Sequence, residues 1–387
     1  MINFDNSATT FPKPAAVKKA LLTAVTRYGG NPGRSGHKLS IDTAEAVFKA
    51  RSAAAEFLGA EPDNTVFAQN CTHALNMALK GTAEKGCHII ISSLEHNAVA
   101  RPVHALCKQG VCTYSVAEVN CDDGRTVENF RRLITPQTKI IACTLGSNVT
   151  GQIIPFTKIA KLCRENGICF IADGAQACGV IPIKLSDGIN ILCTAGHKAL
   201  YGPAGTGLLV TDGKYKISPI MEGGTGSLSM ELDQPDFLPD GLESGTINTC
   251  GAIALGAGIS FVKKLGIDKI YCHENKLCKK FISAIEPLKN ITVYRDKRVK
   301  NYLPVVSFNI NGISANETAG RLSDMGFALR GGLHCSGLAH ISIGTVPDGT
   351  VRFSPSVFNT ESEVDALIYA VKTITEKTYA DTCCNRY

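Results

Sequence analysis

ICFIADGAQ, residues 168–176, is the stretch of sequence that decides the fold. Apolar residues occupy positions 168–172 without a break, and the run ends at Asp173. ILCTAGHK, residues 191–198, has the same form and leads into His197 and Lys198. Short apolar runs of this kind are typical of strands that are buried on both faces, as in a parallel sheet covered by helices. We therefore predict strands over residues 168–172 and 189–194.

The same alternation of strand-like and helix-like segments continues on either side of these two runs. Further short apolar runs predict strands over residues 65–69, 88–92, 111–116, 139–144 and 207–211. Apolar residues at helical spacing predict helices over residues 41–58, 72–80, 99–108 and 156–165. The first two-thirds of the chain therefore reads as an α/β domain with a mainly parallel sheet.

Polar residues follow several of the predicted strands at the point where each strand ends. They are Asn70-Cys71-Thr72, Glu95-His96-Asn97, Ser147-Asn148, Asp173-Gly174-Ala175-Gln176 and Gly196-His197-Lys198. Ligands of open α/β sheets bind beyond the carboxyl ends of the strands. The recurrence of these clusters predicts one site that is assembled from distant segments.

The last third of the chain is organised differently. Residues 221–258 are rich in Gly, Ser, Asp and Pro and predict an extended surface segment. Beyond them we predict helices over residues 268–285, 317–325 and 361–374 and a strand over 305–310. The 387 residues are more than one core normally holds, so two domains are expected.

Composition limits the classes of partner. The net charge of +6, from 40 basic and 34 acidic residues, is small and evenly spread, which argues against a nucleic-acid partner. No uninterrupted apolar run reaches the length of about 18 residues that a membrane helix needs, and the N-terminus has no signal-like pattern. We expect a soluble cytoplasmic protein without a membrane partner. The 16 cysteines form no Cys-x-x-Cys pair, so we expect reduced thiols and no metal site.

The polar clusters contain the groups that pyridoxal 5'-phosphate (PLP) requires. That cofactor needs an amine for its aldehyde, an acid for its pyridine nitrogen, an aromatic face and donors for its phosphate. Lys198 and Asp173 are candidates for the amine and the acid. The strand-to-helix turn over residues 70–76 suits a phosphate, because free N–H groups and the helix dipole point at it.

The order of these motifs resembles that of the class V aminotransferase family, in the group of cysteine desulfurases and selenocysteine lyases. The resemblance runs from Phe4-Asp5-Asn6-Ser7-Ala8-Thr9-Thr10 to residues 352–360 and covers nearly the whole chain. Its most specific elements are Ser147-Asn148-Val149-Thr150-Gly151, Asp173-Gly174-Ala175-Gln176, Gly196-His197-Lys198, Glu243-Ser244-Gly245-Thr246-Ile247-Asn248-Thr249 and Arg330-Gly331-Gly332-Leu333-His334-Cys335.

The resemblance implies an architecture as well as a chemistry. The expected architecture is PLP-dependent transferase fold type I, the aspartate-aminotransferase-like fold, with a smaller α+β domain beside the large one. The large domain would hold residues 16–256, and the small domain residues 1–15 and 257–387. The family implies a homodimer, in which Thr246 reaches the phosphate in the site of the partner subunit.

The resemblance also implies roles for the residues that would hold PLP. Lys198 would carry the cofactor, and Asp173 would pair with its pyridine nitrogen. Gln176 would donate to the phenolic oxygen, and His96 would stack on the ring and help to move protons. The remaining cofactor residues would be Cys71, Thr72 and His197, at the phosphate end.

Three further residues, Asn148, Arg330 and Arg352, would bind the substrate, L-cysteine or L-selenocysteine. Arg352 resembles the carboxylate clamp of the family, assisted by Asn148, because a guanidinium pairs with a carboxylate in a bidentate way. Cys335 would take the sulfur as a persulfide and leave alanine, with Arg330 and His334 favouring its thiolate. A sulfur or selenium acceptor protein, whose identity the sequence does not contain, would then receive it.

Some alternatives stay open at the level of sequence. The motifs do not separate cysteine desulfurase from selenocysteine lyase, and they allow another class V reaction, a transamination or epimerisation, in which Cys335 is incidental. A PLP-binding scaffold without turnover is the remaining alternative. Two positions depart from the family pattern, Ala195 and His73, and the tail with Cys383 and Cys384 is either a sulfur relay or a frayed end.

Overall fold

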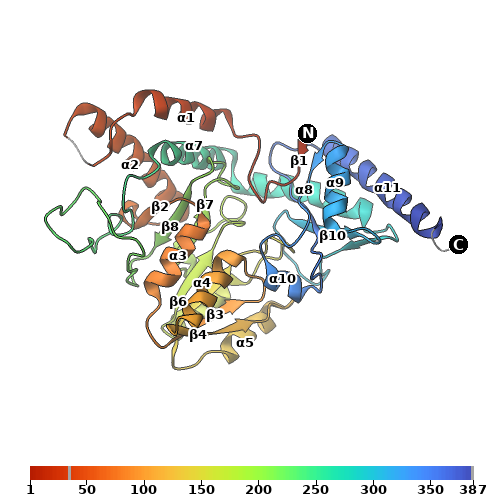
Figure 1. Cartoon of the computed structure of the whole chain (residues 1–387), viewed down its shortest axis with the longest axis horizontal. Helices are drawn as coiled ribbons and strands as arrows, with labels where there is room; N and C mark the ends of the chain where they lie inside the picture. The colour runs from red at the N-terminus through yellow and green to blue at the C-terminus, as the bar shows by residue number, and fades with distance from the viewer. Residues whose placement is uncertain (34–35, 385–387) are drawn as a thin grey trace.

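The computed structural model describes residues 1–33 and 36–384 of the chain (Figure 1). Its largest element is a seven-stranded sheet with the order β2-β8-β7-β6-β5-β3-β4. The strands are β2 (Thr65–Ala68), β3 (Cys87–Ser92), β4 (Cys112–Ala117), β5 (Thr138–Thr144), β6 (Cys169–Asp173), β7 (Ile191–Ala195) and β8 (Gly207–Thr211). Only β8 runs antiparallel to its neighbours in this sheet. The predicted strands and the mainly parallel sheet are therefore confirmed.

Helices cover both faces of this sheet, which explains why its strands are uniformly apolar. One face packs against α3 (Cys71–Thr82) and α4 (Asn97–Lys108) through side chains such as Ile140 and Ala142. The alternate residues Ile141 and Cys143 point to the other face. That face is covered by α2 (Lys38–Leu58), α5 (Asp123–Arg132), α6 (Phe156–Glu165) and α7 (Thr249–Leu265). Two 3₁₀ turns, Pro62–Asn64 and Leu185–Asp187, connect elements of this part.

The C-terminal third forms a separate core around a small antiparallel sheet. Its strand order is β12 (Val351–Phe353), β10 (Val306–Ile310) and β9 (Ile291–Val293). The core is packed by α8 (Ile267–Ile285), α9 (Ala315–Asp324) and α11 (Glu361–Cys384). Stacked rings of Phe281 and Phe353 lie 4.4 Å apart at its centre. The domain boundaries proposed above, at residues 16 and 257, stay a prediction.

The N-terminus belongs to this second core although it is far away in sequence. β1 (Ile2–Asn3) pairs in parallel with β11 (Phe327–Ala328), and Phe4 is buried among the residues of the small core. Asp5 then bridges to Ser354. The chain crosses to the large sheet through α1 (Ala15–Arg27), which packs on α7. The segment Phe4–Thr10 therefore runs between the two cores (Figure 1).

One prediction about secondary structure is wrong. Residues 221–248 form an irregular segment as expected, but residues 249–258 begin the buried helix α7. The glycines that suggested a loop serve close packing instead. A Cβ at Gly256 would lie 2.9 Å from the Cβ of Ala50, and one at Gly258 only 2.3 Å from the carbonyl oxygen of Leu200. Glycine composition was therefore read as a turn signal where it marks a helix interface.

No single helix among the described residues is long and apolar enough to span a membrane, although α7 and α8 together form a bent pair of sufficient length and apolar character.

For the candidate site, the decisive feature is the shared direction of β3, β5, β6 and β7. Thr144 at the end of β5 pairs with Asp173 at the end of β6, so the carboxyl ends of these strands share one edge.

Candidate active site

A cavity of about 350 Å³ lies at this edge of the large sheet. Its wall combines the segments that follow the strand ends with residues from the N-terminus and from the C-terminal third. The lining residues are Ser7, Ala8, Asn70, Cys71, Thr72, His96, Ala98, Thr144, Asn148, Asp173, Ala175, Gln176, Ala195, His197, Lys198, Arg330, His334 and Arg352. The structure therefore gathers the predicted site residues in one wall, except for Cys335 and Thr246.

Asp173 and Lys198 form the floor of the cavity. Asp173 is buried, and its Oδ1 accepts hydrogen bonds from the backbone N–H of Ala175 at 2.9 Å and from the thiol of Cys71 at 3.4 Å. Burial lowers the pKa of Lys198, and the nearby charge of Asp173 acts in the opposite direction. Lysine with a lowered pKa is the form that serves as a nucleophilic amine.

The turn into α3 and the turn after β7 form the polar end of the cavity. Asn70 begins α3 and accepts a hydrogen bond from the backbone N–H of His73. Thr72 lies in the first turn of this helix, where unpaired N–H groups attract anions. His197 faces the same cavity with a buried Nδ1 that has no partner among the described residues. Burial lowers the pKa of His197 to about 4, so its ring is neutral at pH 7.

His96 occupies the turn into α4. Its Nδ1 accepts a hydrogen bond from the backbone N–H of Ala98 at 3.0 Å, so it caps the helix. In a neutral ring the proton then lies on Nε2. Burial lowers the pKa of His96 to about 4, with the charge of Asp173 opposing that shift. The structure therefore holds His96 as a neutral imidazole with a defined tautomer.

Arg352, on β12, brings a buried cation to the wall of the cavity. Its Nη2 forms an ion pair with Oδ1 of Asp5 at 2.7 Å, and its Nη1 donates to the carbonyl oxygen of Asn148 at 3.2 Å. Nε is buried and has no partner among the described residues. The guanidinium is thus fixed in orientation by two of its five N–H donors, and its Nε–H is left without a partner.

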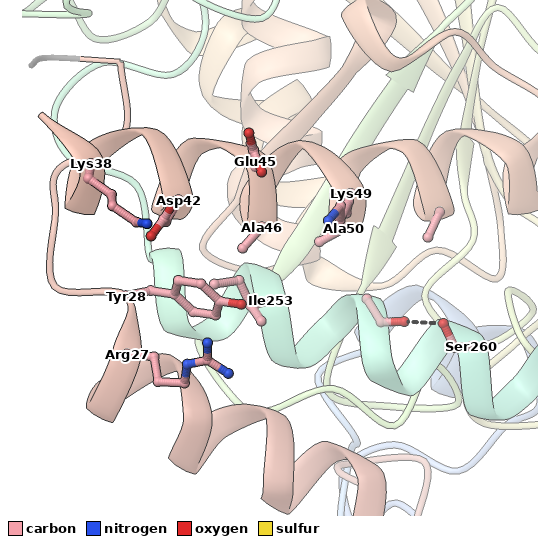
Figure 2. Close-up of a pocket in the computed structure, with 12 residues that line it drawn as sticks. Arg27, Tyr28, Lys38, Asp42, Glu45, Ala46, Lys49, Ala50, Ile253 and Ser260 are labelled. Carbon is pink, nitrogen blue, oxygen red and sulfur yellow. Dashed lines mark hydrogen bonds between the residues drawn. The ribbon is translucent and has the colours of Figure 1, made fainter. Parts of the chain in front are cut away.

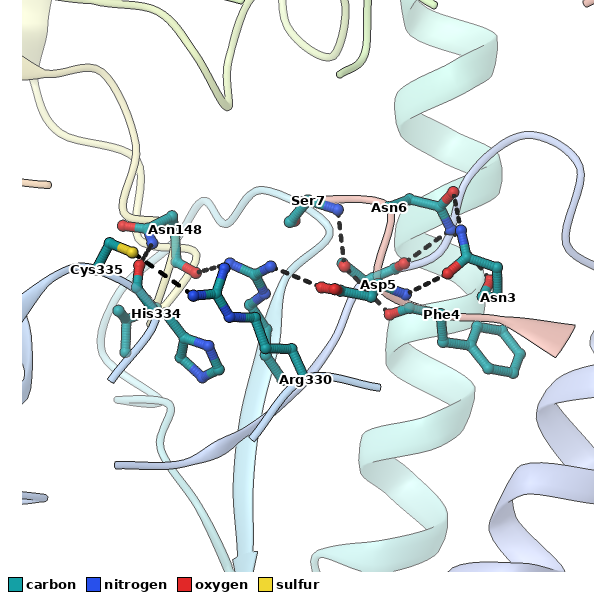
Figure 3. A network of polar contacts seen from close by, with 12 residues as sticks. Asn3, Phe4, Asp5, Asn6, Ser7, Asn148, Arg330, His334 and Cys335 are labelled. Atoms are coloured by element: carbon teal, nitrogen blue, oxygen red, sulfur yellow. Dashed lines mark hydrogen bonds and ion pairs between the residues drawn. The ribbon is translucent and has the colours of Figure 1, made fainter. Parts of the chain in front are cut away.

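Cys335 lies at the edge of this wall in an unusual loop. His334 and Cys335 have φ of 49° and 57°, in the left-handed region that non-glycine residues rarely adopt. The carbonyl oxygen of His334 accepts from Nδ2 of Asn148 at 2.9 Å, and that of Cys335 accepts from the backbone N–H of Asn97 at 2.8 Å. The thiol is exposed, with its sulfur 3.5 Å from Nη2 of Arg330 (Figure 3).

Thr246 lies apart from this cavity. Its hydroxyl accepts a hydrogen bond from Nδ2 of Asn31, and it lines a different cavity beside α2. The preceding Glu243 is held by a bidentate ion pair with Arg51. Within one chain Thr246 does not reach the wall that contains Lys198, so its role across a subunit boundary stays a prediction.

The sequence reasoning missed two residues that support the site. Asp5 was noted only as part of a motif, yet it is the ion-pair partner of Arg352. Lys13 donates to the carbonyl oxygen of His197 and to the hydroxyl of Thr10, each at 2.8 Å. Burial lowers the pKa of Lys13 to about 8. Asp5 is adjacent in sequence to the polar residues Asn6 and Ser7, which could have marked it as a site residue. Nothing in the sequence pointed to Lys13.

A second cavity, of about 560 Å³, lies between α1, α2 and α7 (Figure 2). Its polar lining comes from exposed charged residues of both signs, among them Lys38, Glu45 and Lys49 of α2. It contains none of the predicted site residues. Size alone therefore does not identify the active site in this molecule, because the smaller cavity contains the buried amine and carboxylate.

Comparisons with known proteins agree with this arrangement. The family model described as aminotransferase class-V matches residues 2–367. A probable cysteine desulfurase of Xylella fastidiosa is 30% identical over 380 residues, which cover 96% of this chain and 90% of that protein. A probable cysteine desulfurase of Methanothermobacter thermautotrophicus is 29% identical, over 94% of this chain and 92% of that protein.

Solved structures give the same result. The apo structure of a cysteine desulfurase from Thermococcus onnurineus superposes with a TM-score of 0.89 at 27% identity, over 97% of this chain and 95% of that one. The cysteine desulfurase CsdA of Escherichia coli, in an S-sulfonic acid form, has a TM-score of 0.85 at 27% identity, over 97% and 94% of the two chains. Together with the matched model and the strand order of the large sheet, these likenesses place the chain in the class V aminotransferase family, with PLP fold type I.

Proposed function

We propose that this protein is a PLP-dependent cysteine desulfurase, which converts L-cysteine to L-alanine and keeps the sulfur on Cys335. The observation that carries the proposal is the position of the exposed Cys335 thiol beside Arg330, which lines the cavity that also holds Lys198. A lysine for the cofactor and a free thiol at the edge of one cavity are the two groups that this reaction needs. The family and the names of the relatives support it.

The residues present fit PLP. His197 has a buried Nδ1 that lacks a partner among the described residues, and it lines the same cavity as the first turn of α3, which provides N–H groups. Both hydrogen bonds that the structure gives to the Asp173 carboxylate fall on Oδ1, so Oδ2 is left as an acceptor. Lys198 shares the cavity with both. This set of groups suits a phosphate and a protonated pyridine nitrogen within one cavity.

When bound, PLP supplies an aldehyde that an amine can hold and a conjugated ring that accepts the electron pair released at the substrate Cα. Lys198 would hold the aldehyde, and Asp173 would pair with the pyridine nitrogen. The phosphate would be bound by Thr72, by His197 and by the first turn of α3 around Cys71. His96 would lie against the ring. Nε2 of Gln176 donates one hydrogen to the carbonyl oxygen of Ser7. Its second hydrogen would be donated to the phenolic oxygen.

Substrate binding is assigned to the guanidinium of Arg352. Its cation is buried, and the carboxylate of an amino acid is the natural partner of its unpaired donor. Asp5 keeps the guanidinium in place and offsets part of its charge. Asn148 contacts both Arg352 and the Cys335 loop, so it links substrate binding to the nucleophile. Arg330, beside the Cys335 sulfur, would lie next to the substrate sulfur.

The chain's own groups then carry out the proton and sulfur transfers. Lys198, with its lowered pKa, accepts the proton from Cα as a neutral amine. The Cys335 thiolate attacks the sulfur of the substrate, so that an S–S bond forms and the Cβ–S bond breaks. The electron pair of the broken bond stays on Cβ, which takes up a proton, and Lys198 returns a proton to Cα. The net change converts cysteine and the Cys335 thiol into alanine and a Cys335 persulfide.

We also propose a closed two-fold homodimer. Large apolar side chains are exposed on α1, on α2 and on the irregular segment after β8, with Met230 93% and Leu232 104% exposed. These elements lie toward one end of the molecule in Figure 1. Apolar surface of this extent is typical of a protein interface. Thr246, which follows the irregular segment, would reach the partner's site, and light scattering that finds an active monomer would contradict this.

The exposed thiol of Cys335 also fits transfer to a sulfur acceptor protein, whose identity stays open. Cytoplasmic localisation stays a prediction. The role of Cys383 and Cys384, as a sulfur relay or as part of a frayed end, stays open, because they fall at the end of α11, where side chains lie outside the described part of the structure.

The test is to measure alanine formed from cysteine and from selenocysteine, with and without a thiol reductant. We expect cysteine to give about one alanine per subunit without reductant, because the persulfide occupies Cys335, and continued turnover once reductant removes it. Selenocysteine as the only substrate that yields alanine would favour a lyase. Keto acid in place of alanine would contradict the proposal and favour transamination.

A further inference from the structure

Two buried histidines lie beneath the Cys335 loop, and neither has its hydrogen bonds complete. His334 precedes Cys335, and His340 lies on α10 (Gly337–Ser342). They are 2% and 0% exposed, and their ring centroids are 5.5 Å apart. Nδ1 of His334 and Nε2 of His340 are buried without a partner among the described residues. Two adjacent unpaired nitrogens in one interior need a physical explanation.

The hydroxyl groups around His334 determine its tautomer. Ser307 donates to the carbonyl oxygen of Val149 at 2.7 Å, so its hydrogen is used there. The contact of 3.0 Å between Ser307 and Thr350 therefore requires the hydrogen of Thr350. Thr350 is then left to accept from Nε2 of His334, 3.2 Å away. A neutral His334 consequently carries its proton on Nε2, and its Nδ1 is a free acceptor.

The surroundings of His340 determine the complementary state. Nδ1 of His340 lies 2.7 Å from the hydroxyl of Thr345, whose other acceptor, the carbonyl oxygen of His340, is 3.4 Å away. The carbonyl oxygen already accepts from the backbone N–H of Thr345 at 3.0 Å, so it does not need the hydroxyl, and we assign the hydroxyl hydrogen of Thr345 to Nδ1. A neutral His340 then carries its proton on Nε2. Burial lowers the pKa of both histidines, that of His334 to about 2, which keeps the rings neutral.

The two unpaired nitrogens are therefore a donor and an acceptor. We propose that Nε2–H of His340 donates to Nδ1 of His334, either directly after a small rotation of the rings or through one buried water, and that this bond holds the Cys335 loop in place. His340 would be a positioning residue that acts on Cys335 through His334. The inference rests on the proposed function only for the importance of Cys335, since the contacts themselves do not depend on the reaction.

The loop needs such an anchor because two successive non-glycine residues adopt the left-handed conformation. On the side of the cavity, Asn148 and Asn97 hold the carbonyl oxygens of His334 and Cys335. On the side of the core, the ring of His334 is the only side chain of the pair that is buried. The bond to His340 would tie that ring to α10, which itself packs through Ala339 against the buried Leu94 and Val149.

Backbone hydrogen exchange over residues 330–342 tests the proposal without any turnover. His340→Phe keeps a ring but removes the donor, whereas His340→Gln keeps an N–H near the position of Nε2. We expect exchange in these amides to be about fivefold faster or more in the Phe variant and near the parent rate in the Gln variant. His104→Phe, an exposed histidine on α4, is the matched control and should change nothing there.

Equal exchange in the Phe variant and the parent would overturn the proposal, as would failure of Gln to restore protection. If the Phe variant does not fold, nitrogen-15 spectra of the parent decide. They should show both histidines as neutral Nε2–H tautomers. A proton on Nδ1 of His340 would overturn the proposal. An intact pair in an enzyme that forms no persulfide would instead count against the function alone.

Discussion

The two halves of the candidate site are built in different ways. Asp173 is the last residue of β6, and Lys198 lies three residues beyond the end of β7; neighbouring strands fix both strand ends through a ladder of backbone hydrogen bonds. Cys335 lies in a loop outside any strand or helix, and the side chain of Asn148, 186 residues before His334, holds that loop. The difference shows that the sheet positions the residues proposed to hold the cofactor, whereas individual contacts position the proposed nucleophile.

This difference has a consequence for the chemistry. A group at a strand end keeps its position because the sheet does not yield, which suits a residue that must hold a cofactor through each cycle. A thiol that receives sulfur in the cavity and passes it to another protein must be reachable from both sides. Its exposure and its location at the rim of the cavity agree with that requirement. Variants on the two sides should therefore fail in different ways.

The largest effect is expected on the sheet side, from Lys198→Ala. Without the amine the cofactor has no covalent attachment, so the visible absorbance of the lysine-bound cofactor and all alanine formation should be lost. The measurement is the absorbance spectrum of the purified protein together with an alanine assay. Lys139→Ala, which changes an exposed lysine of β5, should keep both. An unchanged spectrum in the Lys198 variant would show that the lysine is wrongly assigned.

A smaller effect is expected between the two halves, at Arg352. Arg352→Lys keeps a positive charge opposite Asp5 but loses the planar fork that pairs with a carboxylate. KM for cysteine should rise by about 10- to 100-fold, the value of one or two hydrogen bonds to charged groups. The cofactor spectrum should stay as in the parent. Arg132→Lys on the exposed face of α5 serves as control, and an unchanged KM in the Arg352 variant would remove Arg352 from substrate binding.

The smallest effect concerns the stability of the sheet side, measured as the dependence of the free energy of unfolding on pH. Glu95 is fully buried before His96, and burial raises its pKa to about 8. The folded protein therefore keeps a proton that the unfolded chain releases above a pH of about 4.5. Stability from this residue is lost as the pH rises from about 4.5 through 8, at no more than about 1.4 kcal/mol per pH unit.

Glu95→Gln should remove that loss, because an amide does not titrate. The free energy of unfolding, measured with denaturant, should rise in the variant relative to the parent as the pH increases from 6 to 8. The exposed Glu118→Gln provides the control. Parallel pH profiles for the parent and the Glu95 variant would mean that the carboxylate is already ionised in the folded protein.

The same contrast explains how much the sequence alone predicted. The apolar runs that end at Asp173 and Ala195 predicted the strands, because a sheet covered on both faces requires uniformly apolar residues. Since the carboxyl ends of these strands share an edge, the residues that follow them could be placed in one site. His96 and Asn148 were found in this way.

The remaining features depend on contacts that no local pattern encodes. Asp5 reaches Arg352 across 347 positions of sequence, and its partner could not be named before the N-terminus was seen to pack on the small core. The left-handed backbone at His334 and Cys335 could not be predicted, because neither position is a glycine. The start of α7 was wrongly predicted as a loop because glycine is typical both of turns and of closely packed helices. Gly256 belongs to the second kind.

The proposed reaction depends most directly on Cys335 as the acceptor of sulfur, and one measurement tests that role. In Cys335→Ala the cofactor spectrum should match that of the parent, because the sheet side is untouched, while alanine release from cysteine should fall by about a thousandfold or more. Replacement of the exposed Cys272 by Ala should leave that rate unchanged. Alanine release at the parent rate from the Cys335 variant would contradict the desulfurase mechanism and leave only the general class V chemistry of the cofactor side.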